Sequence, residues 1–235
     1  MRTLVPAVLA AIALAAPASA GTRNFGITSF ERIRVEGPYR VQLTTGVAPF
    51  ASASGSPAAL DRVAIDMIGQ TLVVHHNLSA WGASSDSSDN GPVEIRIGTH
   101  DLNSAILDGS GLLQIDRIKG LTFNASASGS GQLAVGKADV DQLNFIMAGT
   151  ASSVIGGRAA MLKLTVRGAS SFDGSGLATK DATIGADGAA TIKAVATNSA
   201  TISGSGPATI TLIGTPACTT HMTGAASVSG CKASQ

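Results

Sequence analysis

Apolar and polar residues alternate along the C-terminal half of the chain in short blocks that end just before a glycine. Two, four and six residues before Gly129 the side chains are Ala127, Ala125 and Phe123, and the residues between them are polar. The same offsets are apolar in three further blocks: Leu143, Phe145, Met147; Leu162, Leu164, Val166; and Ala182, Ile184, Ala186. Alternation with a period of two predicts β-strands with one buried and one solvated face.

The glycines that follow these blocks recur at a nearly constant interval. The intervals are 20, 20, 19, 20, 18 and 18 residues, between Gly109, Gly129, Gly149, Gly168, Gly188, Gly206 and Gly224. The residue two positions after each glycine is small, so we expect each glycine at a corner between two short strands, where a side chain would crowd the core. A period of about 20 residues predicts a right-handed single-stranded parallel β-helix with one coil per repeat.

Stacked coils bring together residues at the same offset from their corner glycines, which predicts contacts between neighbouring coils. Asn124 and Asn144 should form an outward amide ladder, and Arg167 should form an exposed ion pair with Asp187. Both contacts are expected to be structural, and an exposed pair contributes little to stability.

Residues 21–97 carry alternating strand patterns without the glycine interval. The open end of a solenoid exposes apolar side chains and strand edges, which need a cover. We therefore divide the mature chain into an irregular N-terminal β segment at 21–97 and parallel β-helix repeats at 98–235. The N-terminal segment either caps the coils or forms the first, less regular coils.

Residues 1–20 have the layout of a secretory signal peptide. Arg2 precedes an apolar stretch from Leu4 to Ala16 that is too short to span a bilayer, and small residues at Ala18 and Ala20 stand before Gly21. We expect this segment to be removed and the protein to be exported, to the periplasm, the outer surface or the medium. No later apolar stretch reaches about 18 residues, so no membrane span is expected after cleavage.

Composition narrows the class of protein and partner. The formal net charge is +1 and charged residues make up 13% of the chain, whereas nucleic acid requires clustered Lys and Arg. The 28 glycines would suit a flexible linker, but a linker has no apolar columns, and the 44% apolar content indicates a buried core.

Cys218 and Cys231 are the only cysteines, and both lie in the final repeat. In an exported protein we expect them to form a disulfide that holds the last coil shut; free buried thiols are the alternative. A metal site is not expected, because His221 is the only titratable group nearby and no CxxC spacing occurs.

The sole tryptophan, Trp81, lies in a polar loop with Asp86 and Asp89. An aromatic ring beside carboxylates makes this loop a candidate for a sugar or calcium ligand, and a hairpin tip without a ligand fits the same sequence. No cofactor or catalytic residue is expected. Asp139 and Asp141 share one strand face, but such pairs are common on wet surfaces and the other aspartates are scattered over the coils.

The N-terminal motifs, taken in order, resemble the start of a bacterial family. They are Phe30-Glu31-Arg32-Ile33-Arg34-Val35-Glu36-Gly37-Pro38-Tyr39-Arg40-Val41-Gln42-Leu43, Thr45-Gly46, Gln70-Thr71-Leu72-Val73-Val74, Val93-Glu94-Ile95-Arg96-Ile97 and Asp108-Gly109-Ser110-Gly111. The family is the domain of unknown function 2807, also called the head GIN domain or "putative auto-transporter adhesin" family. The resemblance implies a right-handed β-helix, an envelope or surface location and an adhesive role, and it brings no catalytic residues.

We therefore expect a non-catalytic, adhesin-like envelope protein whose outward Ser, Thr and Asn side chains bind a polysaccharide or another surface. The scarcity of aromatic residues, 3% of the chain, counts against sugar binding, because sugar sites usually stack on such rings. The alternatives are a structural periplasmic or matrix component without a specific ligand, and a polysaccharide-degrading enzyme.

Overall fold

The structure, a computed structural model, describes residues 21–77 and 92–232 of the 235-residue chain. The expected signal peptide at 1–20 lies outside the described residues. Within them, no helix has the length and apolar character needed to span a membrane.

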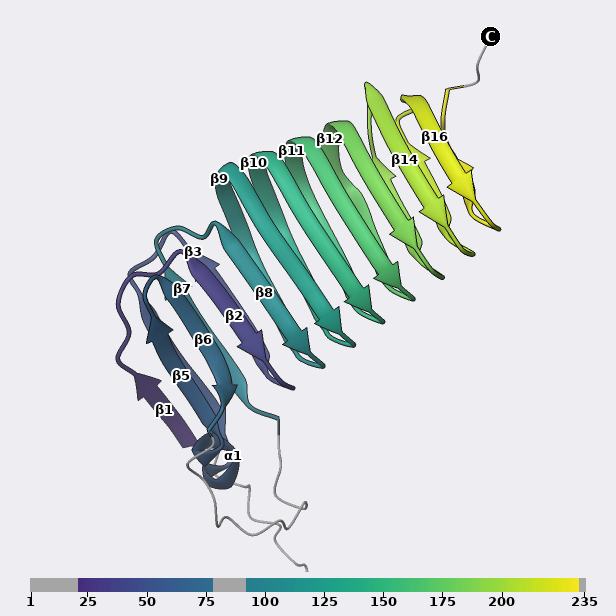
Figure 1. Ribbon diagram of the computed structural model, residues 1–235. Helices are drawn as coiled ribbons and strands as arrows, with labels where there is room; N and C mark the ends of the chain where they lie inside the picture. Colours follow the sequence, from purple (N-terminus) through teal and green to yellow (C-terminus); the bar gives the residue numbers. More distant parts are fainter. Residues whose placement is uncertain (1–20, 78–91, 233–235) are drawn as a thin grey trace, which may run out of the picture.

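The C-terminal part is the predicted parallel β-helix (Figure 1). Four long strands each run through most of a coil and pair in parallel with the next: β9 (Leu112–Gly129), β10 (Gln132–Gly149), β11 (Ser152–Gly168) and β12 (Ser171–Asp187). The later coils are divided into shorter strands: β13 (Thr191–Val195), β14 (Ser199–Ser205), β15 (Thr209–Ile213), β16 (Ala217–Thr223) and β17 (Ser227–Ser229).

The inward columns fill the centre of the rod. Phe123, Leu143, Leu162 and Ala182 lie over one another in register and are at most 3% exposed. Ser153 is a polar residue that points into this core. Its hydroxyl donates a hydrogen bond to the Leu133 carbonyl oxygen at 2.8 Å, so the buried polar group is satisfied.

All seven corner glycines have positive φ, between 76° and 117°. They also stack closely: a Cβ on Gly129 would lie 2.6 Å from the carbonyl oxygen of Gly109. Two separate constraints therefore require glycine at this corner. One is the positive φ, and the other is the close approach of the preceding coil.

Each long coil has three faces, one more than the sequence predicts. Between the two predicted strand faces lies a middle face, which consists of residues 117–121 of β9, 137–141 of β10, 157–160 of β11 and 177–180 of β12. Ile118, Ala138 and Leu177 point inward from it and are at most 1% exposed. On β10 this face alternates between polar and apolar residues, Lys137-Ala138-Asp139-Val140-Asp141, but Gly120 on β9 and Gly157 on β11 interrupt the pattern.

The N-terminal segment forms coils, but in an order that differs from the chain order. Strand β2 (Arg32–Glu36) lies between β6 (Thr71–His76) and β8 (Ser104–Gly109), and β3 (Arg40–Thr45) lies between β7 (Glu94–Thr99) and β9. Ile33 pairs with both Leu72 and Ala105, and all three side chains are fully buried. Strands β2 and β3 are thus inserted between strands that come later in the chain.

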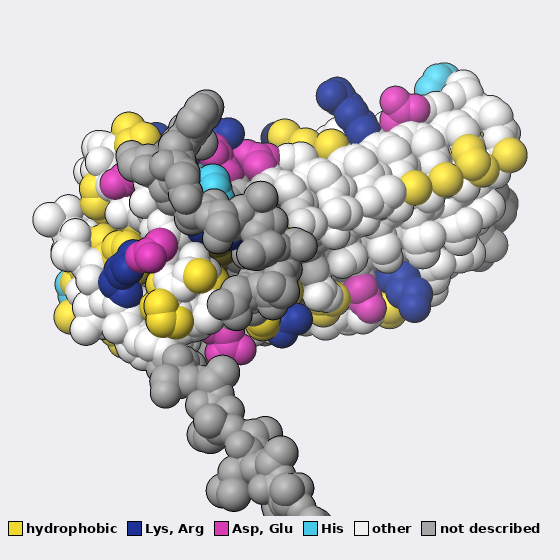
Figure 2. All heavy atoms as spheres, turned by 90° about the horizontal axis from the view of Figure 1, so that it is seen from below, with side chains coloured by type: hydrophobic (Ala, Val, Ile, Leu, Met, Phe, Trp, Pro, Cys, Tyr) yellow, Lys and Arg dark blue, Asp and Glu magenta, His cyan; other side chains and the backbone are white. Residues whose placement is uncertain are grey.

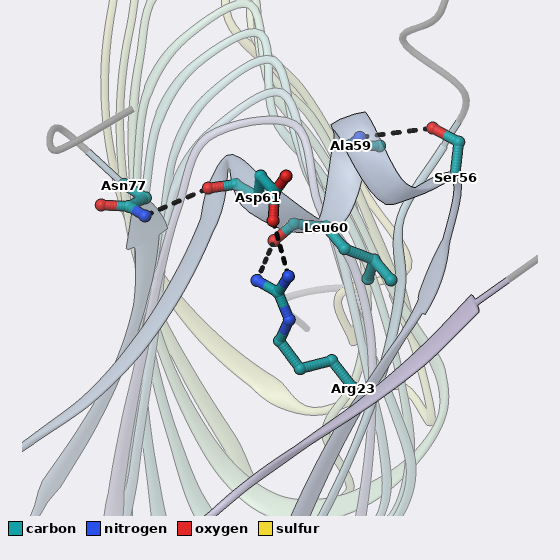
Figure 3. A network of polar contacts seen from close by, with 6 residues as sticks. All are labelled: Arg23, Ser56, Ala59, Leu60, Asp61 and Asn77. Carbon is teal, nitrogen blue, oxygen red and sulfur yellow. Dashed lines mark hydrogen bonds and ion pairs between the residues drawn. The ribbon is translucent and has the colours of Figure 1, made fainter. Parts of the chain in front are cut away.

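The same segment also covers the end of the rod. Strands β1 (Gly21–Phe25), β4 (Phe50–Gly55) and β5 (Val63–Ile68) pair antiparallel with their neighbours, and the short helix α1 (Pro57–Asp61) lies across the end. Arg23 on β1 donates to the Leu60 carbonyl oxygen at 3.0 Å and to Asp61 Oδ1 at 2.6 Å (Figure 3). The segment therefore contributes both to the cover of this end and to the stack of coils.

The opposite end is closed by the predicted disulfide. Cys218 and Cys231 are bonded, with 5.7 Å between their Cα atoms. The inward residues here, among them Met222 and Val228, are only half-buried, because no further coil in the described chain covers them.

A corner glycine provides a test of the stacking. Replacing Gly129 with alanine should lower the free energy of unfolding by about 3 kcal/mol or more, since the change adds both a strained φ and a clash. The matched control is Gly69→Ala: Gly69 also has positive φ, at 60°, but nothing lies within 4 Å of its Cβ position. The control should lose only about 1–2 kcal/mol in urea unfolding. Equal losses at the two sites would contradict the close stacking at Gly129.

The disulfide is tested at the last coil. The double variant Cys218→Ser, Cys231→Ser should lose about 3 kcal/mol, the amount expected for a closed loop of about 15 residues. Hydrogen exchange should show this loss locally, as faster exchange of β16 amides with unchanged protection of β10. Unchanged protection of β16 would mean that the bond does not hold the last coil in place.

Candidate functional site

The expected ligand loop with Trp81, Asp86 and Asp89 lies outside the described residues, so its role stays a prediction. The described surface offers a different candidate, on the middle face.

Cations gather on the middle face. Among β9 to β12 it carries five Lys and Arg residues, whereas the other two faces carry only Lys163 and Arg167. The five are Arg117, Lys119, Lys137, Arg158 and Lys180. In the view of Figure 2, the surface of the coils is mostly uncharged side chains and backbone with isolated charged side chains. The cations of these four coils are therefore concentrated on one face.

The register places opposite charges beside one another. Lys119, Asp139 and Arg158 lie in one column on three successive coils. Arg158 Nε donates to Asp139 Oδ1 at 2.6 Å. This hydrogen bond lowers the pKa of Asp139 and raises the pKa of Arg158, so both groups stay charged and the guanidinium is held in place.

A groove runs between the outward columns of the middle face. A depression of about 410 Å³ is lined by residues of four successive coils, including Asp139, Asp141, Arg158, Lys180 and Thr197. A second depression of about 420 Å³ shares the first three of these residues and extends to Lys119 on β9. The two form one continuous groove, which we call the middle-face groove.

The floor of the groove follows from the register. Val140, Ala159 and Thr179 point inward between the outward columns, stack in register and are at most 6% exposed. The next coil is shorter at this place: Gly174 and Asp181 are seven residues apart, whereas their partners Ala194 and Ser199 are five apart. The groove therefore ends at a step in the rod.

Asp139 and Asp141 do lie together in this groove, and the electrostatics of Asp139 are not those of a catalytic acid. A glycosidase needs one carboxyl group with a raised pKa, to donate a proton to the leaving oxygen. The pKa of Asp139 is lowered instead. Hydrogen bonds from the Ser175 hydroxyl and from Ser199 and Asn198 likewise lower the pKa values of Asp173 and Asp181.

The outer faces of the rod hold the predicted ladder but not the predicted ion pair. Asn144 Nδ2 donates to Asn124 Oδ1 at 2.9 Å. Arg167 and Asp187 are in register, but no ion pair joins them in the described part of the chain; Asp187 accepts a hydrogen bond from Ser205 Oγ at 2.8 Å instead. Ser205 lies in register with Asp187 on the next coil and is its partner in place of Arg167. The prediction considered only one of the two coils that flank Asp187.

A further depression, about 470 Å³, lies near the N-terminal cap and is lined mainly by apolar groups, among them Pro38, Tyr39 and Val93. The Tyr39 hydroxyl already donates to the Arg62 carbonyl oxygen at 3.2 Å, and burial raises the pKa of Tyr39. This depression therefore offers fewer converging polar groups than the middle-face groove.

Comparison with known proteins places this chain in a family. The family profile described as "Putative auto-transporter adhesin, head GIN domain" matches residues 29–216. The chain belongs to the head GIN domain family. The resemblance found in the N-terminal motifs is thereby confirmed. A search of curated proteins gives no match.

Solved structures similar to this head GIN domain share its fold at low sequence identity. A "putative adhesin" of Bacteroides fragilis is 16% identical to this chain, with a TM-score of 0.79. The match covers 89% of this chain and 96% of the adhesin chain. A "putative lipid binding protein" of Parabacteroides distasonis is 17% identical with a TM-score of 0.65, covering 90% and 96%. A "putative adhesin" of Parabacteroides merdae is 15% identical with a TM-score of 0.63, also covering 90% and 96%. At sequence identities this low, the similarity shows a shared β-helix fold and no shared function.

Proposed function

We propose that this head GIN domain is an exported, non-catalytic, adhesin-like protein that binds a polysaccharide of a cell surface or matrix through its middle-face groove. The groove is the observation that carries the proposal, because it is a depression with charged side chains in its lining that runs across several coils. Carboxylate and guanidinium groups, both present at its centre, bond well to sugar hydroxyls. Neither needs an aromatic platform, and aromatic residues make up only 3% of this sequence.

Export is supported by two features of the chain. Residues 1–20 have the layout of a signal peptide, and the bond between Cys218 and Cys231 is of a kind that persists in oxidising compartments. The family description, with its reference to adhesins, agrees with an exported or surface location.

A binding role is favoured over cleavage by the state of the groove carboxylates. Asp139 is held as an anion by Arg158, so it is poorly suited to deliver a proton. The same ion pair orients the Arg158 guanidinium towards Asp139 and leaves 75% of the Arg158 side chain exposed to a ligand.

A glycan array with the mature chain, residues 21–235, tests the proposal. We expect specific hits, and we expect Arg158→Ala to weaken them by on the order of tenfold or more, the usual effect of losing a hydrogen bond to a charged group. Lys163→Ala is the control: it removes an exposed cation from another face of the same coil and should leave binding unchanged. Thermal unfolding of each variant checks that the fold is intact.

Three results would contradict parts of the proposal. An empty array would favour a structural component without a specific ligand. Hits that survive Arg158→Ala would place the site elsewhere, with the loop around Trp81 as the next candidate. Release of shorter products from a bound glycan, abolished by changing Asp139 and Asp141 to Asn, would establish an enzyme.

A further inference from the structure

The direction of the middle-face groove limits the shape of its ligand. The floor residues Val140, Ala159 and Thr179 lie on three successive coils, and Thr197 continues the line, since its backbone N–H bonds to the Thr179 carbonyl oxygen. From Gly120 to Thr197 the groove crosses five coils. At about 4.8 Å per coil it extends for roughly 19 Å along the rod axis. A single sugar would leave most of it empty, whereas a linear chain of several sugars would fill it.

The cations are distributed along this direction. Lys119, Lys137, Arg158 and Lys180 come one from each of four successive coils, three of them lining the groove and Lys137 beside it. In the part of the chain that the structure describes, no ion pair engages Lys119, Lys137 or Lys180. Their ammonium groups act on Asp139 and Asp181 only through longer-range attraction, so they are available to meet anionic groups that recur along a polymer.

The two carboxylates of the groove decide which polyanion fits. Nucleic acid carries a phosphate about every 3.4 Å of strand, and Asp139 and Asp141 at the centre of the groove would repel so dense a charge. An acidic polysaccharide carries sparser charges and many hydroxyl groups between them. Its hydroxyls can donate to the aspartates while its acid groups meet the lysines.

We propose that the middle-face groove binds a linear acidic polysaccharide parallel to the rod axis, with acid groups of the glycan on Lys119 and Lys180 and its hydroxyl groups on Asp141. The inference rests on the proposed glycan-binding function and names the class of glycan. Arg158, oriented by Asp139, contacts the middle of the bound segment.

Binding of three linear acidic glycans, polygalacturonate, alginate and hyaluronate, tests the inference. The comparison in each case is the carboxyl-reduced form of the same polymer, which keeps the backbone and hydroxyls and removes the charge. By calorimetry at low salt, at least one acidic form should bind the mature chain tenfold or more tighter than its reduced form. The difference should shrink as salt is added.

The variants assign this charge preference to the groove. Lys119→Ala with Lys180→Ala should remove the preference for the acidic form and leave the affinity for the reduced form. Asp141→Asn should weaken both forms. Lys163→Ala with Arg167→Ala removes two cations from another face of β11 and should change neither affinity.

The outcomes separate this inference from the proposed function. Equal binding of acidic and reduced forms, or binding of neutral glycans only, would overturn the acidic class and leave glycan binding intact. Equally tight binding of a single-stranded oligonucleotide would mean non-specific attraction of polyanions, which also overturns it. Absence of binding to these polymers and to the glycan array together would remove the proposed function as well.

Discussion

Parallel hydrogen bonding between coils in strict register is the constraint on which the rest of the molecule depends. Because each residue lies over its equivalent in the next coil, a side-chain type that repeats in sequence becomes a continuous column in space. The apolar columns form the core of the rod. The corners must turn without side chains, since the carbonyl oxygen of Gly109 lies where a Cβ of Gly129 would be.

The same register also creates the surface. On the outer faces it produces amide and hydroxyl ladders such as that of Asn124 and Asn144. On the middle face it aligns Lys119, Asp139 and Arg158 above a floor of small buried residues. A groove along the rod axis follows without any loop to build it. The proposed preference for a polymer follows from this direction, because both partners would repeat along the rod axis.

Much of this architecture could be predicted from the sequence, because the coils repeat locally. The offsets that put Phe123 and Leu143 inward, and the bond between Cys218 and Cys231, depend only on the period and the compartment. The insertion of β2 between β6 and β8 could not be predicted, because it depends on pairing between strands about 40 and 70 residues apart.

The middle-face groove was missed for a different reason. Asp139 and Asp141 were recognised as sharing a face, but offsets were compared only up to six residues before each corner glycine. Lys119, Asp139 and Arg158 each stand ten residues before the glycine that ends their coil. Extending the comparison to these offsets would have revealed the column.

A crystal structure of the mature chain with a bound oligosaccharide would decide whether the middle-face groove is the binding site. We expect a glycan that lies along the rod axis over Val140, Ala159 and Thr179, with sugars near Arg158 on one side and Asp141 on the other. A glycan bound across the outer faces, at the N-terminal cap, or perpendicular to the rod axis would contradict it.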